Sequence, residues 1–266
     1  MIIVDADVHV SATAGEGEIE VQDLVRLLDE NEVDKAIAWP MLTYTREVSQ
    51  DNKAIAEGMR KYPDRIIGFG GLNPCLGMEK TLEEFRQCVE EYGIKGFKLN
   101  GARDGYIIDN KNLTFPIFER IVEANLMVAL HSGMNDPVRT HPWRIGNIAE
   151  GFPELKILMV HMGGVGVPGL HDAAIKIAQK YPNIYLVDSE VYRPRNILRA
   201  IDTPGAERVC YGSDEPFYPM KLALAMNKKL VEGLSEEEQK LVMGENILRI
   251  LSLHSTLTVK AKKRAF

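Results

Sequence analysis

Cysteine is scarce in this chain of 266 residues, which contains only Cys75, Cys88 and Cys210. The number is odd, and no two of them have the C-x-x-C spacing of a metal or redox motif. A disulfide-stapled scaffold is therefore excluded. We expect reduced thiols that pack against other side chains, as in a cytoplasmic protein.

An excess of positive charge is also missing. Lysine and arginine number 32 against 38 aspartates and glutamates, so the formal net charge is −6. A protein that binds a nucleic-acid backbone needs concentrated positive charge, and we therefore expect no nucleic-acid partner. The one basic cluster, Lys260 to Arg264, is typical of a solvated chain end.

Long apolar runs are absent as well. No uninterrupted apolar stretch approaches the ~20 residues that a membrane-spanning helix needs, so we expect no membrane partner. The chain opens on the strand-like run Ile2-Ile3-Val4, without the basic segment and apolar core of a secretory signal. The predicted location is the cytoplasm.

What the sequence does contain is a repeated unit. Short apolar runs alternate with segments of helical periodicity, such as Val21, Leu24, Val25 and Leu28 at positions i, i+3, i+4 and i+7. The expected strands begin near Ile2, Asp34, Ile66, Ile94, Leu126, Lys156, Ile184 and Arg208. Their spacing is about the length of one strand–loop–helix unit.

Proline marks the joints between these units. Tyr62-Pro63, Phe152-Pro153 and Tyr181-Pro182 each follow a helical stretch and precede a strand. Proline cannot continue the helix, and it biases the residue before it toward extended geometry. Gly93 and Asn125 end two further helices because they tolerate the left-handed conformation.

Eight strands in alternation with helices predict an α/β fold, a (β/α)8 TIM barrel, as a single domain over residues 1–266. The competing architecture is an open, doubly wound sheet, which expects a glycine-rich phosphate turn after the first strand. Asp5 to Val10 contains no glycine. We therefore favour the barrel.

Four of the expected strands end on an imidazole or a carboxylate. In chain order these residues are Asp7 and His9, His131, His161 and Asp214. Strand ends of such a barrel converge on one mouth. A period of two places Asp5, Asp7 and His9 on the same face of the first strand.

This pattern predicts a divalent metal site. Desolvating polar groups without partners costs several kcal/mol, and a cation would compensate. Imidazole is mostly neutral at pH 7, so its lone pair is available, and carboxylates add hard oxygen. The mixed set favours Zn²⁺ first and Mn²⁺ second. The other three histidines, His141, His171 and His254, are expected to be structural or surface residues.

Six motifs carry a resemblance to a known family. They are D-A-D-V-H-V at 5–10, K-Y-P-D-R-I-I-G-F at 61–69, G-I-K-G-F-K-L at 93–99, L-H-S-G at 130–133, V-H-M-G-G at 160–164 and Y-G-S-D-E-P-F at 211–217. In this order and spacing they resemble the amidohydrolase superfamily. Specifically, they are similar to its amidohydrolase-related branch, which includes aminocarboxymuconate-semialdehyde decarboxylase, γ-resorcylate decarboxylase and several lactone hydrolases. The resemblance extends to Asn246 in G-E-N-I-L-R-I.

The resemblance implies roles for the strand-end residues. It makes His9, His131 and Asp214 metal ligands, and His161 the residue that orients or deprotonates the metal-bound water. The family usually has His-x-His in the first strand, whereas this chain has Asp7 at the first position. Some branch members have an acidic residue there, so Asp7 is included as a fourth ligand. Its charge favours a harder ion.

The reaction we expect first is hydrolysis of an ester, lactone or amide bond in a small, carboxylate-bearing molecule. A divalent ion lowers the pKa of bound water from about 15.7 toward 7, and Asp214 or His161 takes and later delivers the proton. The chain has little room for the long loops of larger decarboxylases, which favours hydrolysis. The alternative is metal-dependent, non-oxidative decarboxylation of an aromatic or muconate-type acid. A third hypothesis, suggested by Asp7, is a barrel without metal that serves as a binding module.

Candidate substrate residues lie at the same strand ends. Lys98 and Asn100 leave the fourth strand and Glu190 leaves the seventh. Arg144 is included because arginine pairs carboxylates bidentately. Phe217 either walls an aromatic pocket or only packs. The sequence does not give the oligomeric state, but family members are often dimers or larger, so a homodimer is one assembly that the resemblance allows.

Overall fold

A computed structural model describes residues 1–41, 47–164 and 166–252, which form one sheet of eight parallel strands. The strands are β1 (Val4–Val10), β2 (Lys35–Pro40), β3 (Ile66–Gly71), β4 (Gly96–Leu99), β5 (Met127–His131), β6 (Lys156–Val160), β7 (Ile184–Val187) and β8 (Val209–Cys210). Each strand pairs with the next one along the chain. His254 and the basic cluster Lys260 to Arg264 lie outside the described residues.

The sheet closes on itself between β8 and β1. The amide of His9 donates to the carbonyl of Glu215 at 2.8 Å, and the amide of Asp214 donates to the carbonyl of Asp7 at 2.9 Å. The predicted (β/α)8 barrel is therefore confirmed, and the open sheet is excluded. Every strand begins within two residues of its predicted start.

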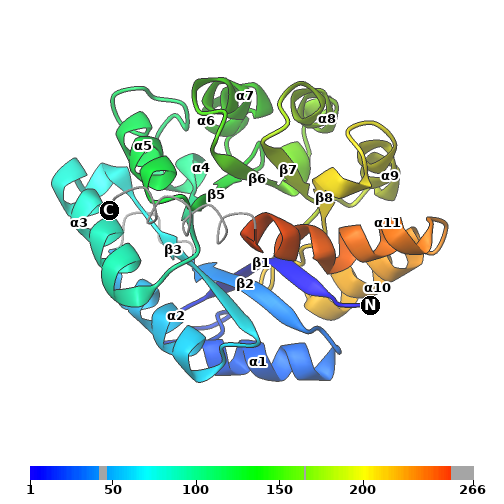
Figure 1. Ribbon diagram of the computed structural model, residues 1–266, viewed down its shortest axis with the longest axis horizontal. Helices are drawn as coiled ribbons and strands as arrows, with labels where there is room; N and C mark the ends of the chain where they lie inside the picture. Colours follow the sequence, from blue (N-terminus) through cyan, green and yellow to red (C-terminus); the bar gives the residue numbers. More distant parts are fainter. Residues whose placement is uncertain (42–46, 165, 253–266) are drawn as a thin grey trace, which may run out of the picture.

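Helices surround the barrel in chain order (Figure 1). They are α1 (Val21–Glu30), α2 (Ser49–Lys61), α3 (Met78–Gln87), α4 (Gly101–Asp104), α5 (Phe115–Glu123), α6 (Pro137–Thr140), α7 (Pro142–Gly151), α8 (Leu170–Lys180), α9 (Pro194–Asp202), α10 (Met220–Val231) and α11 (Glu236–Lys240). Short helical segments are η1 (Pro74–Leu76), η2 (Cys88–Tyr92), η3 (His161–Gly163), η4 (Ala206–Arg208) and η5 (Leu241–Glu245). As predicted, α2, α7 and α8 end at the proline joints: their C-cap residues, Tyr62, Phe152 and Tyr181, each precede a proline.

Alternate strand residues pack on opposite sides of the sheet. Ala129 of β5 belongs to the apolar cluster that fills the barrel, and its neighbour Leu130 belongs to the larger cluster between barrel and helices. Residues 246–252 form a last helix, drawn in red over the barrel in Figure 1. Its Ile247 and Ile250 join the inner cluster. The end of the barrel opposite the predicted site is thus plugged by apolar side chains.

β1 changes face in its middle. Ala6 belongs to the inner cluster, whereas Val8, two positions further, belongs to the outer one. The register with β2 shifts between Asp5 and Val8, which is the mark of a β-bulge. The prediction that Asp5, Asp7 and His9 share one face is therefore wrong. The bulge turns Asp7 and His9 into the mouth and leaves Asp5 on the other side of the strand.

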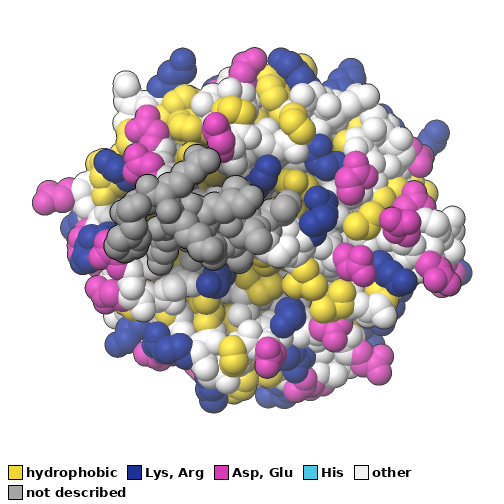
Figure 2. All heavy atoms as spheres, viewed as in Figure 1, with side chains coloured by type: hydrophobic (Ala, Val, Ile, Leu, Met, Phe, Trp, Pro, Cys, Tyr) yellow, Lys and Arg dark blue, Asp and Glu magenta, His cyan; other side chains and the backbone are white. Residues whose placement is uncertain are grey.

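The surface mixes both signs of charge. Figure 2 shows lysine and arginine side chains interspersed with aspartate and glutamate over one face of the molecule.

All three cysteines are free thiols. Cys88 and Cys210 are buried, but Cys75 in η1 is exposed, so the expectation of a packed thiol is wrong there. Within the described ranges, no helix is long and apolar enough to cross a bilayer.

Candidate metal centre

Three electron-rich atoms face one another at the mouth. His9 Nδ1 lies 3.2 Å from the carbonyl of Pro40. A carbonyl only accepts, so Nδ1 carries the proton and Nε2 carries the lone pair. That Nε2 lies 3.6 Å from Asp7 Oδ1 and 3.3 Å from Asp214 Oδ1. Neither buried oxygen has a hydrogen-bond partner among the described residues.

This donor set fits a divalent cation. The ligand atoms of Asp7, His9 and Asp214 all lie within 4.8 Å of one another. Burial, and then the charge of Asp214, raises the pKa of Asp7 to about 7. Burial lowers the pKa of His9 to about 4, so its imidazole is a neutral ligand at pH 7. Without a cation, each buried carboxylate faces the other carboxylate and the lone pair of His9 Nε2, which is unfavourable. A bound cation would stabilise both carboxylates.

Trp39 and Lys98 border this group. The indole Nε1 of Trp39 donates to His9 Nε2 at 3.1 Å, so an ion that binds this lone pair would replace the hydrogen bond from the indole. The ammonium of Lys98 lies 4.0 Å from the centre of a Trp39 ring and is buried, with no hydrogen-bond partner in the described part of the chain. Burial lowers the pKa of Lys98, while the charges of Asp7 and Asp214 oppose that shift. Lys98 therefore lies at the mouth as predicted, with donors to offer.

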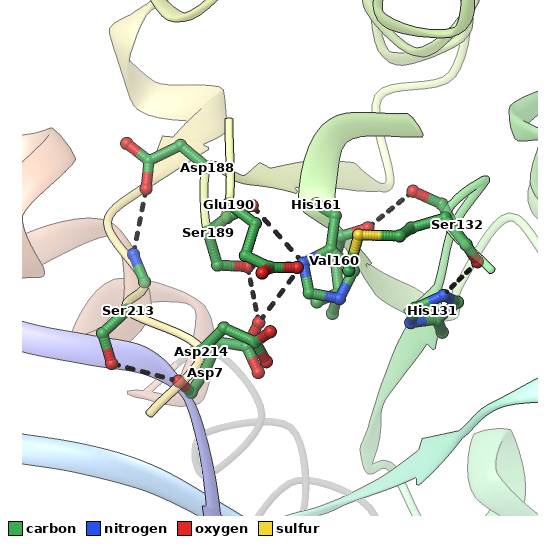
Figure 3. A network of polar contacts seen from close by, with 12 residues as sticks. Asp7, His131, Ser132, Val160, His161, Asp188, Ser189, Glu190, Ser213 and Asp214 are labelled. Carbon is green, nitrogen blue, oxygen red and sulfur yellow. Dashed lines mark hydrogen bonds and ion pairs between the residues drawn. The ribbon is translucent and has the colours of Figure 1, made fainter. Parts of the chain in front are cut away.

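β6, β7 and β8 bring a second group together. The ligand atoms of His161, Glu190 and Asp214 lie within 4.8 Å of one another, and Figure 3 shows the three side chains converging. Their φ angles are 67°, 55° and 69°, in the left-handed region that residues other than glycine rarely adopt. Val160 packs inside the barrel, so alternation alone would point His161 outward. The left-handed backbone instead turns it into the mouth.

Ser189 connects the two groups (Figure 3). Its hydroxyl donates to Asp7 Oδ2 at 2.5 Å and lies 3.0 Å from His161 Nδ1. The side chain is buried. The hydroxyl therefore ties a predicted metal ligand to the histidine that was predicted to handle the proton.

His131 lies beside these groups without joining them. Its ring centre is 4.8 Å from that of His161. Its Nε2 lies 2.7 Å from the carbonyl of Met134, to which it donates. Within the described ranges, no cluster of three or more ligand residues includes His131. The structure thus brings Asp7, His9 and Asp214 together but not His131, whose ligand role stays a prediction.

Asn100 and Arg144 are already engaged in local contacts. Asn100 Oδ1 accepts from the amide of Arg103 at the start of α4, while its buried Nδ2 has no partner among the described residues. Arg144 in α7 donates to Asp109 at 2.8 Å and to the carbonyl of Val138 at 2.7 Å. The geometry leaves Asn100 with a donor to offer, and the substrate roles of both residues stay predictions.

A second pair of buried carboxyls lies beneath the mouth. Asp5 Oδ1 accepts from the amides of Asp7 at 3.1 Å and Ser213 at 2.9 Å. Asp188 Oδ1 accepts from the amide of Gly212 at 3.0 Å. Burial raises the pKa of Asp5 to about 7 and that of Asp188 to about 8. These two side chains hold backbone at the exits of β1 and β8 and so position the groups above.

Two residues of the site were not predicted from the sequence. Ser189 stands in the polar run after β7, and that signal is the same one that indicated His131 and His161. Trp39 stands in the apolar run of β2, so nothing in the pattern distinguishes it from a core residue. Glu190 was expected near the substrate, and the structure places it against His161 and Asp214.

Comparison with known proteins places the chain in a family. The model of the amidohydrolase family matches residues 4–253. The 2-amino-3-carboxymuconate-6-semialdehyde decarboxylase of Dictyostelium discoideum is 26% identical over 76% of this chain and 65% of its own length, just under two thirds. A γ-resorcylate decarboxylase of Polaromonas is 25% identical over 75% of this chain and 78% of its own.

Solved structures agree on the fold. A Polaromonas dihydroxybenzoic acid decarboxylase, solved with bound manganese and the inhibitor 2-nitroresorcinol, superimposes with a TM-score of 0.74. The match covers 95% of this chain and 97% of that one, at 20% identity. At this identity the likeness shows the barrel alone.

These relatives overturn the first expected reaction. Both curated relatives are decarboxylases, so the prediction of an ester, lactone or amide hydrolase is wrong. Chain length misled it, because a short chain says little about which bond a barrel mouth breaks. By the match over nearly its whole length, this chain belongs to the amidohydrolase family, in the branch of the aminocarboxymuconate-semialdehyde and γ-resorcylate decarboxylases.

Proposed function

We propose that this protein is a metal-dependent, non-oxidative decarboxylase of a small aromatic or muconate-type carboxylic acid. The observation that carries the proposal is the triad of Asp7 Oδ1, His9 Nε2 and Asp214 Oδ1, buried acceptors that face one another at the mouth of a barrel whose curated relatives are decarboxylases.

Asp7, His9 and Asp214 would hold the ion. When bound, a divalent ion would act as a Lewis acid toward the oxygens of the substrate. Two carboxylate oxygens and one imidazole suit Mn²⁺ at least as well as the Zn²⁺ favoured on sequence grounds. The manganese in the Polaromonas structure supports the choice of Mn²⁺ for reconstitution.

Decarboxylation requires a proton at one carbon. The bond between the ring or vinyl carbon and the carboxylate carbon breaks, and CO₂ leaves. The electron pair of that bond stays on the ring or vinyl carbon, which takes a proton. Asp214 is the residue we assign to deliver that proton, because its ligand atom lies within 4.8 Å of those of His9 at the metal position and of Glu190 and His161 beside it. In the metal-free protein, burial and then the Glu190 carboxylate raise the pKa of Asp214 well above the usual range. The hydroxyl of Tyr192 donates to Glu190 Oε1 at 2.9 Å and fixes this neighbour.

Lys98 and Phe217 would receive the substrate. The buried Lys98 ammonium pairs with the substrate carboxylate before it leaves as CO₂. The Phe217 ring lies 5.3 Å from the His9 ring and is 46% exposed, so it forms an apolar wall beside the metal position. An aromatic or conjugated acid matches this combination of one cation and one ring face.

The proposal is tested with protein reconstituted with Mn²⁺ and offered γ-resorcylate and 2-amino-3-carboxymuconate-6-semialdehyde. We expect CO₂ release from at least one acid, loss of turnover after chelation and recovery with Mn²⁺. In D₂O, one deuterium should appear at the carbon that lost the carboxylate. Full metal occupancy with both acids left intact would contradict the proposal.

Lys98→Met tests the substrate contact. We expect KM to rise about 10- to 100-fold, because a charged hydrogen bond to a carboxylate contributes about 1.5–3 kcal/mol. Lys95→Met is the matched control, since Lys95 precedes the same strand and is exposed. Equal kinetics for the two variants would remove Lys98 from the site.

A further inference from the structure

The side chains of His161, Ser189 and Asp7 form a continuous hydrogen-bonded chain. His161 Nδ1 lies 3.0 Å from Ser189 Oγ, and Ser189 Oγ lies 2.5 Å from Asp7 Oδ2. All three residues are buried, with an exposed fraction of 2% or less. Figure 3 shows Ser189 between the other two. At such buried side chains the direction of each hydrogen bond follows from the donor and acceptor capacity of the groups themselves.

The direction follows from what each atom can do. His161 Nδ1 also lies 3.3 Å from the backbone carbonyl of Ser189, and a carbonyl only accepts. This longer contact favours a proton on Nδ1, and the shorter contact to the Ser189 hydroxyl decides it. The Asp7 carboxylate likewise only accepts, so the Ser189 hydroxyl gives its hydrogen to Asp7 and receives one from His161.

The two acceptors at Nδ1 determine which nitrogen is left free. A neutral imidazole has one N–H and one lone pair. With the proton on Nδ1, the lone pair belongs to Nε2, on the side of the ring away from Ser189.

We propose that Ser189 is a positioning residue that fixes His161 as the Nδ1-protonated tautomer and keeps Nε2 as a proton acceptor. The direction of the chain depends on the carboxylate of Asp7. An imidazole at position 7 that ligates through one nitrogen would offer an N–H to Ser189. The hydroxyl would then donate to His161 Nδ1 and force the proton onto Nε2. Asp7 thus determines which nitrogen of His161 can accept a proton.

The use of Nε2 as an acceptor during turnover rests on the proposed decarboxylation. There it would take a hydrogen bond from a hydroxyl or amino group next to the departing carboxylate. The tautomer itself does not depend on the reaction.

The test is ¹H–¹⁵N NMR of the full chain, labelled at histidine and loaded with diamagnetic Zn²⁺. His161 is identified among the six histidines by the signal that His161→Gln removes. We expect a protonated Nδ1 and an unprotonated Nε2. Ser189→Ala should give a mixture of tautomers, because only the longer contact to the carbonyl remains, and Ser189→Thr should restore the single form. Asp7→His should move the proton to Nε2.

Kinetics provide an independent measurement. Ser189→Ala should lower kcat about 10- to 100-fold with KM within about twofold, and Ser189→Thr should recover most of kcat.

Ser213→Ala is the control for the NMR experiment, since that buried hydroxyl contacts the backbone of Asp7 and not its carboxylate. A protonated Nε2 in the unmodified protein, or an unchanged tautomer in Ser189→Ala, overturns the proposal. A failed decarboxylation assay with the expected NMR result would contradict the reaction and leave the tautomer assignment standing.

Discussion

The barrel contains two layers of buried carboxyls that differ in their partners. In the lower layer, Asp5 Oδ1 and Asp188 Oδ1 accept hydrogen bonds from backbone amides, while the second oxygen of each has no partner among the described residues. In the upper layer, no backbone amide is held: Asp7 Oδ2 accepts from the Ser189 hydroxyl, and Asp7 Oδ1 and Asp214 Oδ1 face His9 without a hydrogen-bond partner in the described part of the chain. Burial raises the pKa of carboxyls in both layers.

Burial alone therefore does not identify a functional carboxylate. The lower pair is the stabilising one, since backbone amides at strand exits would otherwise be buried without acceptors. The upper pair lowers the stability of the metal-free protein, because its two carboxyls lie close together in a buried site. Such a cost is expected where function and stability conflict. Substitutions in the two layers should consequently have opposite effects on the stability of the metal-free protein.

The largest effect is expected for Asp214→Ala. Loss of one of three ligands and of the predicted proton donor should reduce kcat/KM at least about 10³-fold and abolish stoichiometric binding of Mn²⁺. The metal-free variant should nonetheless be as stable as the unmodified protein or more stable, because a buried carboxyl that lies beside the carboxyls of Asp7 and Glu190 is removed. Metal content is measured by mass spectrometry and stability by urea unfolding in the presence of EDTA.

Asp172→Ala is the control for this variant. Asp172 in α8 is about half exposed and pairs with Arg199 on the surface, so neither metal content nor activity should change. Retention of one tightly bound ion in Asp214→Ala would show that the triad is not the metal site.

Strand order and the exits of β5, β6 and β8 were predictable because short apolar runs and the polar residues that end them are local signals. The directions of the β1 side chains were predictable only in part. Asp7 and His9 were correctly expected at the mouth, but the face of Asp5 was not. A bulge is decided by pairing with the neighbouring strands, so the one-dimensional pattern does not contain it.

The features of the site that the sequence did not predict depend on backbone that departs from regular structure. His161 and Glu190 reach the mouth through left-handed conformations, which neither residue type favours by itself. The contact of Trp39 with His9 spans two strands and exists only after the barrel closes. Tertiary packing holds these features, and propensity along the chain does not indicate them.

A smaller effect, on stability, is expected for Asp5→Ala. The amides of Asp7 and Ser213 would lose their buried acceptor, at a cost of about 2–4 kcal/mol in the free energy of unfolding. Asp5→Asn keeps an acceptor oxygen and should lose less. Urea unfolding of both variants in EDTA gives the comparison with Asp214→Ala. A loss below about 1 kcal/mol for Asp5→Ala would mean that the lower layer does not stabilise the strand exits.

The smallest effect is the pH dependence of the Asp188→Asn variant. Burial raises the pKa of Asp188 from its ordinary 3.8 to about 8, so the folded state binds more protons than the unfolded state between these values. The stability that this group contributes is thus fully present below about pH 4 and is lost as the pH rises through 8. The amide that replaces the carboxyl in this variant does not titrate, and between pH 5 and 8 the metal-free wild type should lose about 1–3 kcal/mol relative to the variant. Urea unfolding in EDTA across this pH range measures the difference. The opposite slope would mean that Asp188 is ionised in the folded state and that burial does not raise its pKa.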